Sequence, residues 1–148
     1  MTLMELAGAY QIFGSGGVYY EPKLYNLITD YNDKTVIEQE PLGDRVMESD
    51  SAYITNRLLK AVTDTTNGSG RYAKIDGIEV VGKTGTSNDE RVFAFAGLTA
   101  DYCGVIRLGF DDNKNIGTTN YIYLAQVWHN FMVNVCLLYT SDAADDLI

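Results

Sequence analysis

The chain has 148 residues, of which 46% are hydrophobic and 21% charged, as expected for one globular domain. A net charge of −9, with eleven scattered basic residues, argues against a nucleic-acid partner. No apolar run approaches the ~18 residues typical of a membrane span.

The N-terminal part is predicted to form a helix followed by a β-rich arm. Thr2 and Glu5 have the spacing of a capping box, and Gly14 is predicted to end the helix. The apolar stripe of this helix comprises Leu3, Leu6, Ala7, Tyr10 and Phe13. Short β-rich runs follow at residues 18–20, 24–31 and 35–38, and a turn at 32–33 joins the last two as a surface hairpin.

The second half predicts a helix, a three-stranded meander and a last helix. Ser49 is the expected N-cap of the second helix, which ends before a polar loop at 63–70. Strands are expected at 78–81, 93–98 and 102–110, and their short connections favour antiparallel pairing. The apolar face of the last helix comprises Tyr121, Leu124, Ala125, Trp128, Phe131 and Met132. The predicted fold class is therefore α+β, an antiparallel sheet flanked by helices.

The last fourteen residues, 135–148, follow abruptly on a well-patterned segment and lack periodicity of their own. They resemble the translation of a sequencing adapter, so we interpret them as foreign to the protein and restrict the predicted domain to residues 1–134. A natural acidic tail is the alternative. Without Cys136, Cys103 is the single cysteine, which excludes a disulfide framework and a thiolate zinc cluster.

Residues 77–86 match two unrelated motifs. From Gly77 they fit G-x-x-x-x-G-K-[ST], a phosphate-binding loop, and from Lys83 they read K-T-G, a motif of penicillin-interacting serine enzymes. A phosphate loop needs a buried strand before Gly77 and a helix that starts beside the lysine. Residues 71–76 are not such a strand, and Gly85 disfavours such a helix, so the pattern argues against a nucleotide site. A plain strand end and turn remains an alternative.

The segments around this motif resemble one family. Residues 1–22, a helix followed by Gly-Gly and Tyr-x-Pro, residues 80–102 around K-T-G, and the Gly-Phe-Asp-Asp of 109–112 occur in the order of the transpeptidase domain of penicillin-binding proteins. The similarity is greatest to the bifunctional, class A type. It implies that residues 1–134 are the C-terminal part of such a domain, with a β-lactamase/D,D-transpeptidase-like fold.

The resemblance also implies roles for four residues. Lys83 would be catalytic, placing a positive charge beside a nucleophilic serine. Gly85 would let an extended peptide lie along the strand edge, and Thr86 would bind the substrate carboxylate and offer its N–H to the oxyanion. Thr84 would occupy the neighbouring position of the substrate-binding strand. For Lys83 and Thr86 to face the same site, the strand should bend at Gly85.

The function implied for the longer protein is peptidoglycan D,D-transpeptidation. Its partners would be stem peptides ending in D-Ala-D-Ala and β-lactams, without a metal or cofactor. It would act on the extracytoplasmic face of the membrane, anchored by a segment before Met1. Two alternatives remain open, a non-catalytic module that binds cell-wall peptide and a β-lactamase of the same fold.

The chain departs from the family in ways that limit these implications. No serine begins the Ser-x-x-Lys or Ser-x-Asn motif that the family needs. The serines are Ser15, Ser49, Ser51, Ser69, Ser87 and Ser141. Leu3 and Ala100 stand where the family usually has proline, and residues 92–95 lack the usual Asp and Trp, so no role of those two is carried over. The single histidine, His129, is interpreted as a helix surface residue. The chain itself is expected to be inactive.

Overall fold

A computed structural model describes the backbone of residues 1–117 and 122–145, and side chains up to residue 137. The elements are α1 (Leu3–Gly14), β1 (Val18–Tyr20), β2 (Leu27–Thr29), β3 (Thr35–Glu38), β4 (Gly43–Arg45), α2 (Ser49–Asp64), the 3-10 turn η1 (Arg71–Ala73), β5 (Val81–Thr86), the turn η2 (Asn88–Glu90), β6 (Val92–Leu98), β7 (Cys103–Gly109) and α3 (Ile122–Asp145). The predicted α+β class is confirmed. Tyr121 lies outside the described residues.

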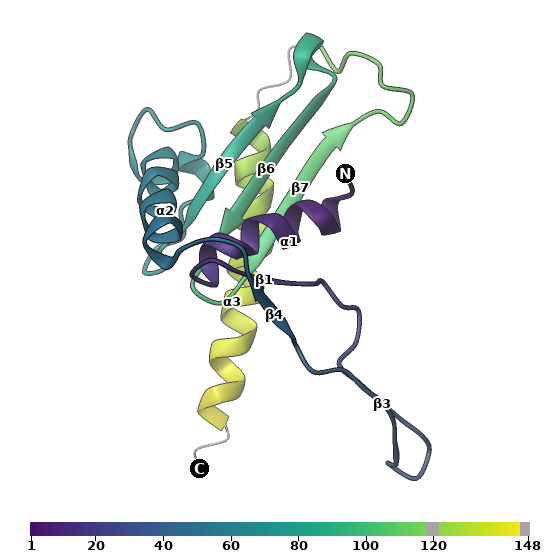
Figure 1. Ribbon diagram of the computed structural model, residues 1–148. Coiled ribbons are helices and arrows are strands. Elements are labelled where there is room, and N and C mark those ends of the chain that lie inside the picture. The colour runs from purple at the N-terminus through teal and green to yellow at the C-terminus, as the bar shows by residue number, and fades with distance from the viewer. Residues whose placement is uncertain (118–121, 146–148) are drawn as a thin grey trace.

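The central sheet is an antiparallel meander in the order β5-β6-β7, as predicted (Figure 1). Helix α3 covers one face, whereas α1 crosses the other and α2 lies beside β5. The register assigns each side chain to a face. Phe95 packs edge to face on Trp128 of α3, with ring centroids 5.5 Å apart, whereas the Cys103 thiol donates to the Ala7 carbonyl of α1. Successive residues of each strand therefore alternate between the α3 face and the α1 face.

Trp128 is the centre of the core between the sheet and α3. Its indole N–H donates to the Gly104 carbonyl at 2.9 Å, and it is almost completely buried. Gly97 pairs with Gly104 across β6 and β7. A Cβ at Gly97 would lie 2.7 Å from the indole, so the glycine is required by close approach of the ring.

Helix α1 begins with the predicted capping box. The Thr2 hydroxyl accepts from the Glu5 N–H at 3.2 Å, and the Glu5 carboxylate accepts from the Thr2 N–H at 2.7 Å. The predicted apolar stripe is only partly covered, because Leu3 at the start of the helix is exposed. Gly8 is the buried residue of the helix, and a Cβ there would collide with Pro22.

The arm after α1 contains the predicted hairpin and one pairing that the sequence did not predict. β2 and β3 pair antiparallel, and Asp33 has a positive φ of 60° in the turn. β2 covers only Leu27–Thr29, so the predicted strand at 24–31 was too long. β4 pairs with β1, and its sequence Gly-Asp-Arg has no β-rich signal. The hairpin projects away from the sheet (Figure 1).

Three further predictions were wrong, two about element boundaries and one about a core residue. Ser49 is the first residue of α2, and the N-cap is Glu48, which makes no side-chain capping bond. The first strand of the meander begins at Val81, because residues 75–78 instead form a tight turn with Gly77 at φ 78°. Phe131 points away from the core of α3 and is 66% exposed. Among the described residues, no helix has the length and apolar character needed to cross a membrane.

Candidate functional site

The K-T-G residues form the exposed half of an edge strand. Val81 and Gly82 at the start of β5 are buried, whereas the strand emerges from the core at Lys83. The start of β5 packs tightly on the core, because a Cβ at Gly82 would lie 2.7 Å from the Phe95 ring. Among the described strands β5 pairs only with β6. One backbone edge of residues 83–86 is therefore open to an extended ligand.

Lys83 lies on the α1 face of the sheet. It is paired in register with Ala96, whose neighbours along β6 on that face include Leu98, packed close to Gly14 of α1. The Lys83 ammonium donates to the Thr84 carbonyl at 2.9 Å. It forms no ion pair with a described residue. Its positive charge is thus exposed and not neutralised within the described chain.

Thr84 and Thr86 lie together on the opposite face. They pair with Phe95 and Phe93 in an uninterrupted register, without a bulge at Gly85. The predicted bend at Gly85 is therefore wrong, and Lys83 shares its face with Gly85, not with Thr86. A ligand at this edge would have to contact the strand from the side to reach both faces.

Gly85 is not required by packing within the chain. A Cβ there would have Ala94 as its nearest neighbour, at the ordinary contact distance of 3.7 Å. This differs from Gly82 and Gly97, where a Cβ would overlap neighbouring atoms. The absence of a side chain at Gly85 leaves open space beside the strand.

Ser69 contacts one of the K-T-G residues, and the sequence did not predict this contact. Its hydroxyl lies 2.8 Å from the Thr84 hydroxyl, in a partly buried position. The segment 63–70 is rich in Gly, Ser, Thr and Asn, and this composition predicts a loop but no partner for it. The available signal was the tripeptide Gly68-Ser69-Gly70, in which a glycine flanks the serine on each side.

The far end of β5 is fixed by the turn into β6. The Ser87 N–H donates to the Val92 carbonyl at 2.9 Å, and its hydroxyl accepts from the Val92 N–H at 2.8 Å. The Asn115 side chain donates to the Asp89 carbonyl. The loop after β7 thereby supports this turn, and the exposed half of β5 is held at both ends.

Other chemically capable residues lie away from Lys83. His129 belongs to α3, on the opposite side of the sheet (Figure 1). Burial of the Cys103 thiol raises its pKa to about 11, so it stays protonated and unreactive at neutral pH. Across the described part of the chain, no group of three or more His, Cys, Asp and Glu could hold a metal ion.

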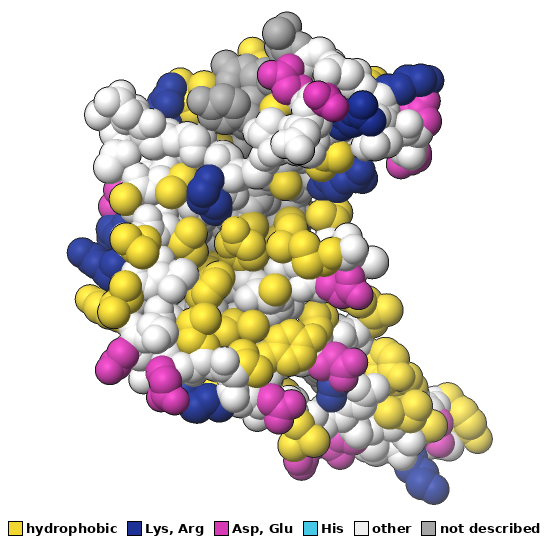
Figure 2. Space-filling view, turned by 45° about the horizontal axis from the view of Figure 1, so that its top comes forward, with side chains coloured by type: hydrophobic (Ala, Val, Ile, Leu, Met, Phe, Trp, Pro, Cys, Tyr) yellow, Lys and Arg dark blue, Asp and Glu magenta, His cyan; other side chains and the backbone are white. Residues whose placement is uncertain are grey.

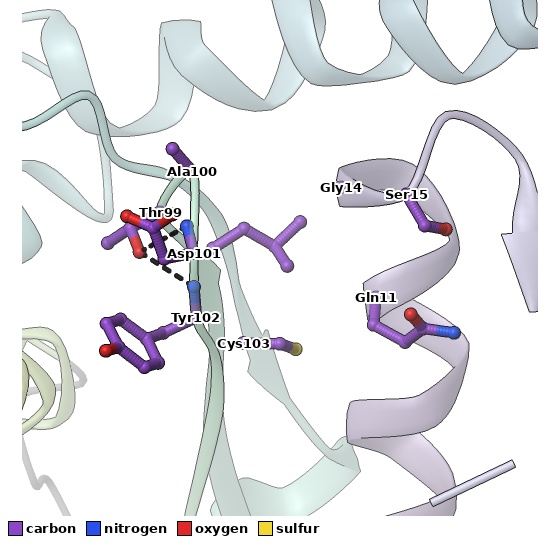
Figure 3. Close-up of a pocket in the computed structure, with 9 residues that line it drawn as sticks. Gln11, Gly14, Ser15, Thr99, Ala100, Asp101, Tyr102 and Cys103 are labelled. Atoms are coloured by element: carbon purple, nitrogen blue, oxygen red, sulfur yellow. Dashed lines mark hydrogen bonds between the residues drawn. The ribbon is translucent and has the colours of Figure 1, made fainter. Parts of the chain in front are cut away.

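A cavity of about 210 Å³ lies between the end of α1 and the turn from β6 to β7 (Figure 3). In that turn the Thr99 hydroxyl accepts from the Asp101 and Tyr102 N–H groups, as the dashed lines show. Leu98 in its wall pairs with Val81, at the opposite end of β5 from Thr86. The cavity is therefore separate from the K-T-G residues.

The comparisons with known families point to one family. The penicillin binding protein transpeptidase domain matches residues 1–90. Penicillin-binding protein 1A of Clostridium acetobutylicum is 34% identical over 129 residues, which are 86% of this chain and 16% of that protein. Penicillin-binding protein 1A/1B of Bacillus subtilis is 31% identical over 125 residues, 75% of this chain and 13% of that protein. The matched part of the chain thus spans between about an eighth and a sixth of the length of these relatives.

Solved structures show the same fold. The crystal structure of penicillin-binding protein 1A from Haemophilus influenzae superposes with a TM-score of 0.78 at 22% identity, covering 91% of this chain and 26% of that one. Penicillin-binding protein 3 from Mycobacterium tuberculosis, complexed with aztreonam, gives a TM-score of 0.72 at 22% identity, covering 95% of this chain and 36% of that one.

Proposed function

Because this chain belongs to the family of penicillin-binding protein transpeptidase domains, we propose that it is part of a longer peptidoglycan D,D-transpeptidase, here called the parent protein. The parent cross-links stem peptides by serine acyl transfer. Residues 1–134 are the C-terminal part of its transpeptidase domain, and residues 135–148 are foreign to it. The relatives named above are roughly six to eight times as long as the matched segment.

One observation carries this proposal. The K-T-G residues are the exposed half of an edge strand, with two threonine hydroxyls on one face and, on the other, a Lys83 ammonium that forms no ion pair with a described residue. An open strand edge binds an extended peptide through its backbone N–H and C=O groups, and side chains on either face then contact the peptide ends. The end of a stem peptide is a ligand of this shape, with a terminal carboxylate.

The four residues have distinct tasks in the proposed reaction. Lys83 stabilises negative charge near the nucleophile on the α1 face and eases proton transfer. Thr84 and Thr86 donate hydroxyl hydrogens to the carboxylate, and the Thr86 N–H contributes to the oxyanion hole, where one donor is typically worth about 3 kcal/mol. Gly85 leaves space for the peptide. The open position above Gly85, where a Cβ would have only Ala94 nearby, supports this last role.

The nucleophile belongs to another part of the parent. None of the serines of the chain begins Ser-x-x-Lys or Ser-x-Asn, so we propose that both motifs are contributed by the remainder of the transpeptidase domain. The isolated chain is then catalytically inert. The parent acts on the extracytoplasmic face of the membrane, where its substrate is, through an anchor outside this chain.

β-Lactams are the proposed inhibitors. The Mycobacterium tuberculosis relative was solved in complexes with aztreonam and ampicillin. Those compounds bear an anionic group beside the reactive ring, the counterpart of the stem-peptide carboxylate. The same edge of β5 would therefore bind both ligands, with no cofactor.

Incubation of the full-length parent with a fluorescent penicillin tests the proposal. We expect a covalent band on denaturing gels for the parent and none for the isolated chain. Lys83→Ala in the parent should slow formation of the band at least a hundredfold, because one preorganised charge is lost. Lys74→Ala, which removes another exposed lysine outside the site, should leave the rate unchanged.

Three outcomes would contradict the proposal. A parent that binds stem peptide without forming the band would be a non-catalytic binding module. A covalent band on the isolated chain would mean that the nucleophile lies within these 148 residues. Rapid release of the bound penicillin by the parent would instead identify a β-lactamase.

A further inference from the structure

We infer that Ser69 is a positioning residue, which holds the Thr84 hydroxyl in the orientation that donates a hydrogen bond to the ligand carboxylate. The inference rests on the proposed function and adds a residue outside the K-T-G motif. Its starting point is the 2.8 Å distance between the Ser69 and Thr84 hydroxyl oxygens. This contact joins segments fifteen residues apart in the chain.

The loop that carries Ser69 is shaped by its two glycines. A Cβ at Gly68 would lie 2.2 Å from the Val62 carbonyl oxygen, so no other residue fits there without a shift of the backbone. A Cβ at Gly70 would approach the Phe95 ring to 3.0 Å. The Gly70 N–H donates to the Val62 carbonyl at 3.0 Å. The loop is therefore closed tightly over the end of α2, with Ser69 between two buried glycines.

The flanks of the loop are tied to β5. The Thr63 hydroxyl donates to the Val80 carbonyl, immediately before β5, at 2.6 Å, and Thr63 is almost completely buried. On the other flank Ala73 is fully buried in the core that also contains Phe95. Both ends of the segment are thus fixed relative to the strand that carries Thr84. The Ser69 hydroxyl is held in reach of Thr84 by the fold.

The number of hydrogens determines which way the bond runs in the bound state. Each hydroxyl has one hydrogen to donate and two lone pairs, whereas a carboxylate only accepts. If Ser69 donates to Thr84, the Thr84 hydrogen is free for the carboxylate, and the two bonds polarise each other in the same direction. Without Ser69 the Thr84 hydroxyl can rotate among staggered positions, and part of its orientation is lost.

The test compares two ligands that differ in one group. Second-order acylation rates of the full-length parent are measured with a penicillin and with its methyl ester, which lacks the carboxylate charge. Ser69→Ala should lower the ratio of the penicillin rate to the ester rate about tenfold, the upper end of the net effect of one neutral hydrogen bond. Ser69→Thr, which keeps the hydroxyl, should retain most of the ratio. Ser69→Cys keeps the shape with a weaker donor and should lower it.

Matched controls separate positioning from a structural effect. Ser51→Ala removes an exposed hydroxyl on α2 and should change neither rate. Equal slowing of acylation by both ligands in Ser69→Ala would overturn the inference. An unchanged ratio of the two rates in both Ser69→Ala and Ser69→Cys would also overturn it. In either case, acylation of the wild-type parent would still support the proposed function. If the wild-type parent is not acylated at all, the proposed function fails, and the inference fails with it.

Discussion

At the residue scale, glycine stands at two positions of the sheet for different physical reasons, and the structure distinguishes these reasons. At Gly97 the Trp128 indole occupies the place where a Cβ would be, at 2.7 Å. At Gly85 the nearest described atom, apart from those of its own chain neighbours, is the Ala94 Cβ at 3.7 Å. The first glycine is demanded by packing, and the second is free to serve a ligand.

Alanine substitutions should therefore have opposite effects at these two positions. Gly97→Ala in the full-length parent should destabilise the domain by about 1–3 kcal/mol, because the Cβ overpacks the core. Gly85→Ala should leave stability nearly unchanged but slow acylation by penicillin. Melting temperature and the acylation rate are the two readouts. A large loss of stability in Gly85→Ala with normal acylation would contradict the assignment.

The sequence singled out the residues of K-T-G as candidates, and their roles stay predictions, but it did not predict their arrangement on the strand. Lys83, Thr84, Gly85 and Thr86 were identified because a short motif has a fixed order, which a single sequence preserves. Which of them share a face depends on whether the strand bends, and the regular pairing of β5 with β6 answers this. Ser69 was missed because its contact with Thr84 joins distant segments, and loop composition does not record such contacts.

At the element scale, α2 and β5 are joined by a buried hydrogen bond. Thr63, in the last turn of α2, donates to the Val80 carbonyl. β-branched residues at 78–81 suggested that the strand begins earlier, yet the turn around Gly77 takes up that segment. The start of β5 is determined by this tertiary bond and by burial of Val81, and neither is visible in local propensity.

Removal of this hydroxyl should loosen the junction. Thr63→Val keeps the volume but leaves the Val80 carbonyl without its partner in the core, which typically costs about 1–3 kcal/mol. Thr55→Val is the matched control, because the Thr55 hydroxyl bonds within its own helix, to Ser51, at an exposed position. Urea unfolding of the two variants in the parent measures the difference. Equal stabilities would show that the Thr63 bond contributes little.

At the scale of the whole molecule, the element order and the antiparallel meander followed from hydrophobic periodicity and turn residues. The packing of the outer surfaces did not follow from these sequence signals. Phe131 was expected in the core of α3, but Met132 and Trp128 already fill that face, and Phe131 is left outside. β4 was missed because its pairing with β1 depends on the course of the arm between them.

Several apolar surfaces of the described chain have no cover. They lie on the arm, on α1 and on α3, and Figure 2 shows apolar side chains gathered across the middle of one face. The exposed large apolar side chains on these elements include Leu24, Leu42, Tyr123, Phe131 and Met4. Large uncovered apolar patches on a soluble domain mark surfaces that bind another segment or self-associate. In the proposed parent, the remainder of the transpeptidase domain would cover part of them.

The isolated chain should therefore fail to behave as a compact monomer. We expect it to elute as oligomers in size-exclusion chromatography, to bind the dye ANS and to melt without a cooperative transition, since apolar surface without cover favours association and loose packing. The full-length parent, in which these surfaces are covered, is the control and should bind little dye. Tyr123→Lys with Phe131→Lys should reduce oligomer formation, because both side chains are exposed on α3. A monomeric isolated chain with a sharp melt would show that the surfaces tolerate water and need no further part of the protein.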